Sequence, residues 1–247
     1  MVIGGGGDWE RELENLDLLY GLGVRIMQLT YNLRNFVGDG CTERYESGLS
    51  YFGVDVVERM NKLGMLVDTG HCGYQTTLDA VEISKTPAIA SHTGCRSVYD
   101  YPRSKTDEEL QAIAENGGYV GIYAYDNFLA KERGNVTDFL DHIDYAVNLI
   151  GAEHVGIGTD AFIHPKMPER LLEKMDQDEP RWSGFWVQDW LEASALAVAL
   201  IEARVGSLVW TNWPYFTVGL VSRGYSDQEI QKIIGGNFLR ILEKVIG

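Results

Sequence analysis

Short apolar runs alternate with longer amphipathic stretches along the chain as far as Asp160. Runs rich in β-branched residues predict strands, and stretches with apolar residues three and four positions apart predict helices. Strands are predicted at residues 24–30, 65–69, 88–91, 119–123 and 154–159, and residues 2–4 are a further candidate. Helices are predicted at residues 10–22, 51–63, 76–84, 106–116 and 137–150.

Strands that alternate with helices indicate an α/β fold with a parallel sheet. Two architectures remain open on this pattern, the doubly wound sheet and the (β/α)₈ barrel. No Gly-x-Gly-x-x-Gly follows a predicted strand, and the glycines at residues 4–7 lack the Lys-Ser/Thr of a phosphate-binding loop. Dinucleotide and nucleotide phosphate sites are therefore disfavoured.

The chain after Asp160 has a different pattern. Residues 164–183 are rich in proline and charge and predict an irregular segment, whereas residues 187–204 predict a helix. Residues 210–216 (WTNWPYF) predict an aromatic loop, which we expect in the core or an interface rather than walling a substrate pocket. A capping box at residue 226 opens a terminal pair of helices. No linker or repeat interrupts the sequence, so a single domain over residues 1–247 is expected.

Composition narrows the classes of partner. The 247 residues carry 21 Lys+Arg and 36 Asp+Glu, a formal net charge of −15, which argues against binding nucleic acid or an anionic membrane surface. No apolar run approaches the roughly 20 residues of a membrane-spanning helix, and the first residues do not resemble a signal peptide. The three cysteines, Cys41, Cys72 and Cys95, are widely spaced, which predicts reduced thiols and a cytoplasmic location.

Polar residues that follow predicted strands are the candidates for chemistry. His71, His92 and Asp160 each lie at or just after the end of a strand, where the residues of a parallel barrel converge on one face. Two histidines and an acid in register predict a hydrolytic metal site, although each alone would more often be a core or capping residue. Arg103 could bind a substrate carboxylate or be an ordinary surface arginine. The other histidines suggest no site, and His142 is expected on a solvated helix face.

Several colinear segments resemble the renal or membrane dipeptidases of peptidase family M19. They are LGVRIMQLTYN at residues 22–32, GLSYFGVDVVERMNKLGMLVDTGH at 48–71, PAIASHTGCRSV at 87–98, HVGIGTD at 154–160 and GYSDQEIQKIIGGNFLRILEKV at 224–245. The resemblance implies a (β/α)₈ TIM barrel of the metallo-dependent hydrolase type with two zinc ions. It also implies hydrolysis of dipeptides and related amides that bear a free carboxylate.

The resemblance also implies roles for individual residues. His71 and His92 match the metal ligands on the fifth and sixth strands of the family. Asp160 matches the acid on the eighth strand that handles a proton of the nucleophilic water. Arg103 matches the arginine that binds the substrate carboxylate. Tyr31 stands where the family has a substrate-contacting histidine, and a phenol can still form a hydrogen bond to a substrate oxygen.

The chain departs from the family near its first residue. It matches from about the third strand, so we expect a barrel that lacks the first two strands and the His-x-Asp metal pair of the first. The family's metal-bridging glutamate falls near Gly4, and Asp8, Glu10 and Glu12 lie close to that position without aligning with it. His71 and His92 then supply two ligands, fewer than the three of a typical catalytic zinc, so zinc occupancy is in question.

Three interpretations follow. The chain is an incomplete member of a zinc dipeptidase family, or it completes its barrel with another chain, which leaves a homo-oligomer open. Alternatively it is a truncated or degenerate barrel without catalysis that acts in binding or assembly. The first interpretation is favoured, because the downstream site residues persist while only the upstream ligands are lost.

Overall fold

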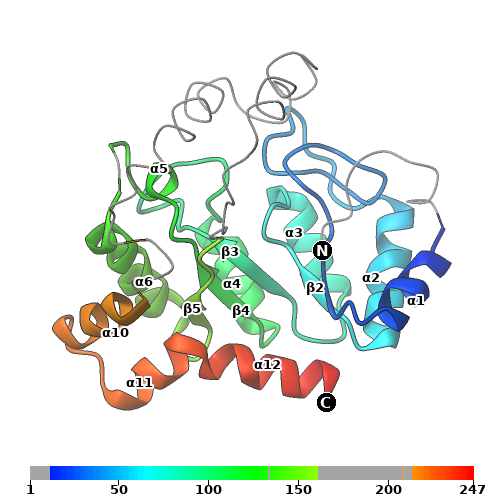
Figure 1. Cartoon of the computed structure of the whole chain (residues 1–247). Helices are drawn as coiled ribbons and strands as arrows, with labels where there is room; N and C mark the ends of the chain where they lie inside the picture. Colours follow the sequence, from blue (N-terminus) through cyan, green and yellow to red (C-terminus); the bar gives the residue numbers. More distant parts are fainter. Residues whose placement is uncertain (1–11, 133, 161–207, 209–212) are drawn as a thin grey trace, which may run out of the picture.

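The computed structural model describes residues 12–132, 134–160, 208 and 213–247, where five strands alternate with helices (Figure 1). The strands are β1 (Ile26–Gln28), β2 (Leu66–Asp68), β3 (Ile89–Thr93), β4 (Tyr119–Ile122) and β5 (Val155–Ile157). The helices are α1 (Glu14–Gly21), α2 (Tyr51–Leu63), α3 (Tyr74–Ile83), α4 (Asp107–Glu115), α5 (Asp126–Leu129), α6 (Val136–Ile150), α10 (Trp213–Ser222), α11 (Asp227–Gln231), the π-helical η3 (Lys232–Gly236) and α12 (Asn237–Ile246). The predicted strand at 2–4, the irregular segment at 164–183 and the helix at 187–204 lie outside the described residues.

The five described strands form one parallel sheet in the order β1-β2-β3-β4-β5. Neighbours in space are therefore neighbours in the chain, and the order does not reverse at any point in this part of the sheet. A doubly wound sheet reverses its strand order at a switch point, whereas a barrel adds each strand beside the previous one. The described strands form part of a TIM barrel, in agreement with the sequence.

Side-chain caps fix where several helices begin. The Ser50 hydroxyl accepts a hydrogen bond from the Gly53 amide at 2.9 Å, and α2 ends at Gly64, whose φ of 72° suits glycine. The predicted capping boxes at the starts of α4 and α11 are both present. In the described ranges, none of the helices has the length and apolar character that crossing a membrane requires.

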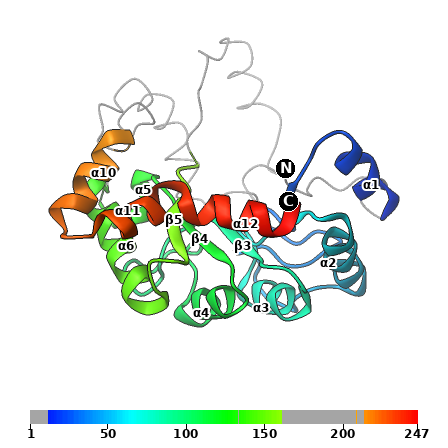
Figure 2. The ribbon, with the colours of Figure 1, turned by 90° about the horizontal axis from the view of Figure 1, so that it is seen from below.

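Helices cover the outside of the sheet and the amino ends of its strands. Figure 2, seen from below, shows α2, α3, α4 and α6 in an arc along one side and α12 running across in front of the strands. Leu66, Ile89 and Tyr119, the first residues of β2, β3 and β4, pack in one buried cluster with Ile241 of α12. Further residues that pack against this cluster are Ile26, Phe238, Leu242, Val245 and Ile246. Helix α12 therefore closes the amino ends of the strands and leaves the carboxyl ends to other residues.

The predicted aromatic loop at 210–216 is wrong in its second half. Trp213 begins α10, and Pro214 occupies its first turn, where proline is tolerated because the amide there has no partner within the helix. Phe216 is fully buried against Phe139 of α6, with ring centroids 4.6 Å apart. The expectation of a core role is met by Phe216, while Trp213 and Tyr215 are exposed.

The expectation that His142 lies on a solvated face is also wrong. Its side chain is fully buried on the inner face of α6. The Cys95 amide donates to its Nδ1 at 2.9 Å, and its Nε2 lies 3.0 Å from the Leu129 carbonyl oxygen. Both ring nitrogens thus have backbone partners, which is how a buried imidazole avoids an unsatisfied polar group.

Candidate active site

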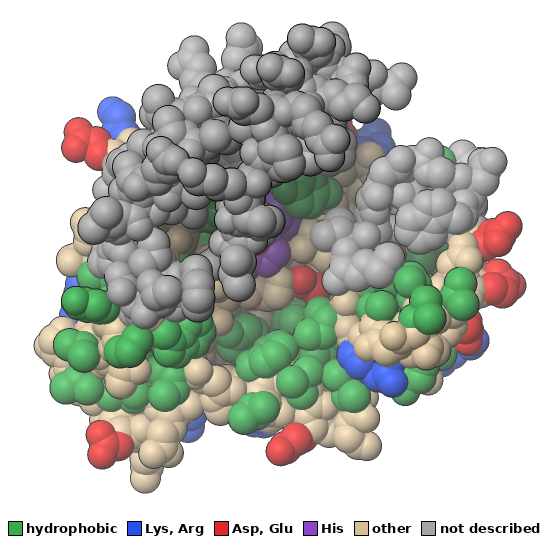
Figure 3. Space-filling view, viewed as in Figure 1, with side chains coloured by type: hydrophobic (Ala, Val, Ile, Leu, Met, Phe, Trp, Pro, Cys, Tyr) green, Lys and Arg blue, Asp and Glu red, His purple; other side chains and the backbone are tan. Residues whose placement is uncertain are grey.

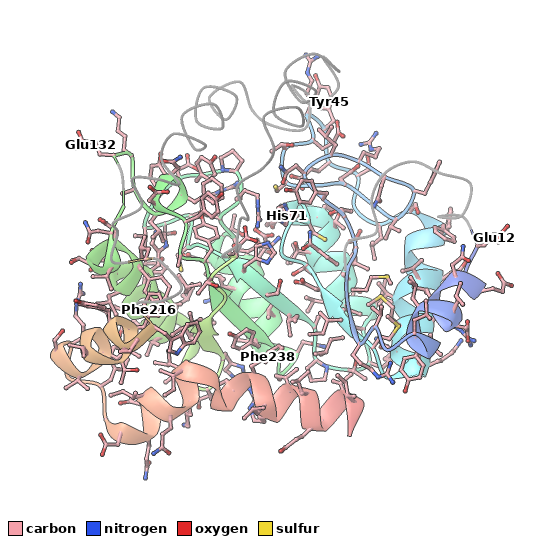
Figure 4. All side chains as sticks on the ribbon, in the orientation of Figure 1. Glu12, Tyr45, His71, Glu132, Phe216 and Phe238 are labelled. Carbon is pink, nitrogen blue, oxygen red and sulfur yellow. The ribbon has the colours of Figure 1, made fainter. Side chains whose placement is uncertain are left out.

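The side-chain rings of Tyr31, His71 and His92 lie close together near the carboxyl ends of β1, β2 and β3. Tyr31 follows β1, His71 follows β2, and His92 is the penultimate residue of β3, not the first residue after it as predicted. The ring centroids of Tyr31 and His71 are 4.3 Å apart, and those of His71 and His92 are 4.9 Å apart. Figure 4 shows His71 near the centre of the molecule above the strands, and histidine atoms are visible near the centre of the same view in Figure 3.

Both imidazoles have their Nδ1 atoms engaged with oxygen. His71 Nδ1 lies 2.6 Å from the Asn32 side-chain oxygen, and His92 Nδ1 lies 2.7 Å from the Ser91 hydroxyl. We assign the ring proton to Nδ1 in both residues, because a carboxamide oxygen can only accept and the Ser91 hydroxyl donates elsewhere. This leaves the lone pair on Nε2. Within the described part of the chain, the buried Nε2 of His92 makes no hydrogen bond.

Both histidines are neutral at physiological pH. Burial lowers the pKa of His92 to about 3, with further contributions from the charges of Arg103 and Lys105. Burial and the same arginine hold the pKa of His71 well below its ordinary value. A neutral imidazole with its Nδ1 engaged and its Nε2 lone pair available is the form that binds a metal ion.

The phenol of Tyr31 is a proton donor at neutral pH. Burial, and then the negative charge of Asp160, raise the pKa of Tyr31 to about 12. The hydroxyl therefore keeps its proton and can donate it to an acceptor on a ligand. The same interaction places the carboxylate of Asp160 close enough to Tyr31 to act on its titration, so both predicted residues share this site.

Asp160 follows β5 and is half-buried. Its φ of 53° is left-handed, and it is the one residue other than glycine with a positive φ in the described ranges. Aspartate tolerates this conformation better than most residues, because its short side chain can bond locally. Such backbone conformations are frequent at functional sites.

Arg103 is buried, so the alternative of an ordinary surface arginine is wrong. Its guanidinium donates from Nη1 to the Gly70 carbonyl oxygen and from Nη2 to the His92 carbonyl oxygen at 3.3 Å. Its buried Nε has no hydrogen-bond partner within the described residues. The guanidinium is therefore held beside both histidines, and its Nε–H is among the donors that it can offer to a ligand.

A buried ion pair anchors the loop that carries Arg103. Lys105 Nζ lies 2.9 Å from the Glu109 carboxylate and donates to the Cys72 carbonyl oxygen at 2.7 Å and to the Thr77 hydroxyl at 2.5 Å. Both charged side chains are about 3% exposed. Because Cys72 directly follows His71, the pair ties the Arg103 loop to the segment that carries the first histidine.

The residues present fit a metal ion at two ligand positions. His71 and His92 supply neutral imidazole nitrogens, which suit zinc, and a metal would satisfy the orphaned Nε2 of His92. No group of three or more His, Cys, Asp or Glu side chains within the described ranges is arranged to hold a metal. Of the acids near the expected bridging position, Asp8 and Glu10 lie outside those ranges. Glu12 is exposed and far from His71 (Figure 4).

Three residues that hold the histidines were missed in the sequence. Asn32 contacts His71, and Ser91 and Asp68 form a chain to His92. The sequence indicated two of them only weakly, by their closeness to the histidines. Ser91 directly precedes His92, and Asp68 lies three residues before His71. Short polar residues next to histidines at strand ends are common, so spacing alone did not distinguish them.

Comparisons with known proteins give the family and the fold of the chain. The profile of the family described as membrane dipeptidase (peptidase family M19) matches residues 1–175. "Dipeptidase verJ" from Clonostachys rogersoniana is 31% identical over 229 residues, which is 92% of this chain and 50% of the relative. The crystal structure of an amidohydrolase from Pseudomonas aeruginosa is similar with a TM-score of 0.76 and 30% identity, over 96% of this chain and 69% of that one.

A metallopeptidase from Rhodobacter sphaeroides, solved with a phosphinate mimic of the dipeptide L-Ala-D-Ala, shares the fold. Its TM-score is 0.71 at 21% identity, over 94% of this chain and 59% of that one. The chain spans half of the length of the fungal dipeptidase and 43% of mouse dipeptidase 3. The family profile covers most of the chain, and the fold agrees with it. This chain belongs to peptidase family M19, the membrane dipeptidases.

Proposed function

We propose that this chain is a metal-dependent dipeptidase that uses zinc. Its substrates are dipeptides, or related acylated amino acids, with a free carboxylate. The observation that carries the proposal is the pair of neutral imidazoles at adjacent strand ends, one with an unsatisfied Nε2, beside the buried guanidinium of Arg103. His71 and His92 are the metal ligands, and a zinc ion bound there supplies a water of lowered pKa and polarises the amide carbonyl.

The other site residues act on the substrate. Arg103 binds the substrate carboxylate, because a guanidinium with a spare donor suits an anionic acceptor. Tyr31 donates its hydroxyl hydrogen to a substrate oxygen, in keeping with a pKa of about 12. Asp160 accepts a proton from the attacking water and passes it to the leaving amine. The names of the fungal relative and the ligand of the Rhodobacter structure favour dipeptides as the first substrates to try.

The proposal is tested with the purified chain. We expect bound zinc by elemental analysis and hydrolysis of a panel of dipeptides that includes L-Ala-D-Ala. Asp160→Asn is expected to retain zinc and lose about 10²–10⁴-fold in kcat, the usual contribution of a general acid–base group. Asp55→Asn, an exposed change on α2, is the matched control and should behave as wild type. Absence of zinc after growth and purification with zinc present would contradict the metal assignment, and full turnover by Asp160→Asn would contradict its role.

A cytoplasmic location and self-association are further proposals. Cys41, Cys72 and Cys95 are all free thiols, and two of them are buried, which suits a reducing compartment. Cell fractionation tests the location. Light scattering combined with zinc analysis at several protein concentrations tests whether a second copy contributes to the site, because metal content would then rise with association.

A further inference from the structure

Asp68, Ser91 and His92 form one hydrogen-bonded chain across two neighbouring strands. The Ser91 hydroxyl donates to Asp68 Oδ2 at 2.5 Å, and the same hydroxyl oxygen lies 2.7 Å from His92 Nδ1. Asp68 ends β2, Ser91 lies in β3, and the two strands are paired in parallel. Asp68 is 4% exposed, so its carboxylate has little contact with water.

Burial raises the pKa of Asp68, and hydrogen bonds from Ser91 and Gly70 act against this by stabilising the ionised form. Oδ1 accepts from the amides of Gly70 and Ser91, both at 2.9 Å. As an ionised carboxylate Asp68 acts only as an acceptor, and the number of protons available then fixes the direction of each hydrogen bond in this chain. The Ser91 hydroxyl has one hydrogen and gives it to Asp68. Its oxygen can then only accept from His92, which places the ring proton on Nδ1 and the lone pair on Nε2.

His71 is held differently. Its Nδ1 faces the neutral carboxamide of Asn32 directly at 2.6 Å, with no hydroxyl between the two groups. The two imidazoles therefore have partners of different charge. A carboxylate behind a donor ring raises the basicity of the opposite nitrogen and fixes the orientation of the ring. For His92, the carboxylate of Asp68 acts in this way on the ring through the hydroxyl of Ser91.

We propose that Asp68 and Ser91 are positioning residues that fix the tautomer and orientation of His92 for metal binding, with the Ser91 hydroxyl as the relay. The inference rests on the proposed function, because it assigns His92 as a metal ligand. Its immediate effect is on the metal-free protein, in which His92 is already held with Nε2 unprotonated. Metal binding then needs no rearrangement of this ring.

The test compares three serine variants. Ser91→Ala removes the relay, and Ser91→Thr keeps a hydroxyl at the same position. Ser84→Ala, which removes a buried hydroxyl bonded to Asn61 and the Thr86 carbonyl near the other end of the sheet, is the matched control. Zinc affinity is measured by competition with a chromophoric chelator. The tautomer of His92 in the metal-free chain is read from its imidazole ¹⁵N shifts by NMR.

Ser91→Ala is expected to weaken zinc binding by about 10–100-fold, the usual effect of losing an outer-shell partner, and to give His92 a mixture of tautomers. Ser91→Thr and Ser84→Ala should keep wild-type affinity and the single Nδ1–H tautomer. Asp68→Asn, if it folds, should resemble Ser91→Ala, since the carboxamide nitrogen offers a donor where the serine needs an acceptor.

The outcomes separate the inference from the proposed function. If Ser91→Ala binds zinc as tightly as wild type and keeps the Nδ1–H tautomer, the relay is wrong even though the dipeptidase assignment stands. If the wild-type chain binds no zinc, the proposed function fails, and the relay as a device for metal binding fails with it. If affinity falls equally in Ser84→Ala, the effect is general destabilisation and the proposal is overturned.

Discussion

The phenol ring of Tyr31 lies stacked on the imidazole of His71, with centroids 4.3 Å apart and an interplanar angle of 21°. One face of a proposed metal ligand is therefore covered by the side chain proposed to contact substrate. The ring and the hydroxyl of Tyr31 then have different proposed roles. Under the proposed function, the ring limits the motion of His71, and the hydroxyl, whose pKa is raised to about 12, donates a hydrogen bond to a ligand.

Tyr31→Phe should distinguish the role of the ring in stacking on His71 from the role of the hydroxyl in binding a ligand. The stack is kept and the hydroxyl is lost, so zinc affinity should stay at the wild-type level while kcat/KM falls by about 2–15-fold, the equivalent of one net hydrogen bond. Tyr31→Ala should lower zinc affinity as well, because the ring face of His71 is uncovered. Equal zinc affinity in all three proteins would show that the stack does not position His71.

Arg103→Lys should raise KM for a dipeptide by about 10–100-fold with a smaller change in kcat. Lysine keeps the charge, but it cannot reproduce the planar fork that holds two backbone carbonyls and leaves a donor free. Arg96→Lys in the same loop is the control. Dipeptides amidated at the C-terminus should be equally poor substrates for wild type and variant; if they were equally good for both, Arg103 would not read the carboxylate.

Glu109→Gln should destabilise the chain by about 3–5 kcal/mol at neutral pH, because it leaves the buried Lys105 ammonium without its carboxylate. Urea unfolding followed by circular dichroism measures the change. Glu115→Gln, an exposed position on the same helix, is the control and should change stability by less than about 0.5 kcal/mol.

The same pair predicts a pH dependence. Burial raises the pKa of Glu109, but Lys105 and the hydrogen bonds from Thr106 lower it more, so the net pKa lies below its ordinary value of 4.5. A carboxyl whose folded pKa is depressed stabilises the protein fully above its unfolded pKa. That stability is lost as the pH falls through the folded pKa. Wild type should therefore lose this contribution below about pH 4.5, and Glu109→Gln should show a shallower decline there.

Phe216→Ala should cost about 3–5 kcal/mol, the range for removing a large buried aromatic side chain. Its ring fills the space beside Phe139 and fixes α10 on α6. Tyr215→Ala is the matched control, because Tyr215 directly precedes Phe216 and is 56% exposed. This change should leave the free energy of unfolding nearly unaltered. A similar small loss in both variants would place this aromatic segment outside the core.

The order of the elements was predictable, because apolar periodicity and capping residues are local. The helix at residues 51–63 has the predicted bounds, and each described strand lies within two residues of its prediction. Local pattern misassigned residues 213–216, because the burial of Phe216 depends on α6, far away in the chain. It also misassigned His142, whose partners Cys95 and Leu129 come from two other segments.

The candidate site followed partly from sequence. Strand-end position identified His71 and His92, since parallel strands bring their carboxyl ends together. Arg103 could not be settled this way, because its buried guanidinium bonds to the backbone carbonyls of Gly70 and His92, which come from two other segments of the chain. Asp68 became significant only through the register of β2 against β3, which is a property of the folded sheet.

The position of α12 has a consequence for how the chain folds. Ile241 packs on Leu66, Ile89 and Tyr119, residues that lie far before it in the sequence. Every strand it covers is synthesised before α12 exists, so the apolar amino ends of β2, β3 and β4 stay open to solvent during translation. Contacts between residues so far apart in sequence slow folding, and they leave aggregation-prone apolar surface exposed in the nascent chain. A nascent chain that ends before residue 237 therefore lacks the helix that buries these apolar strand ends.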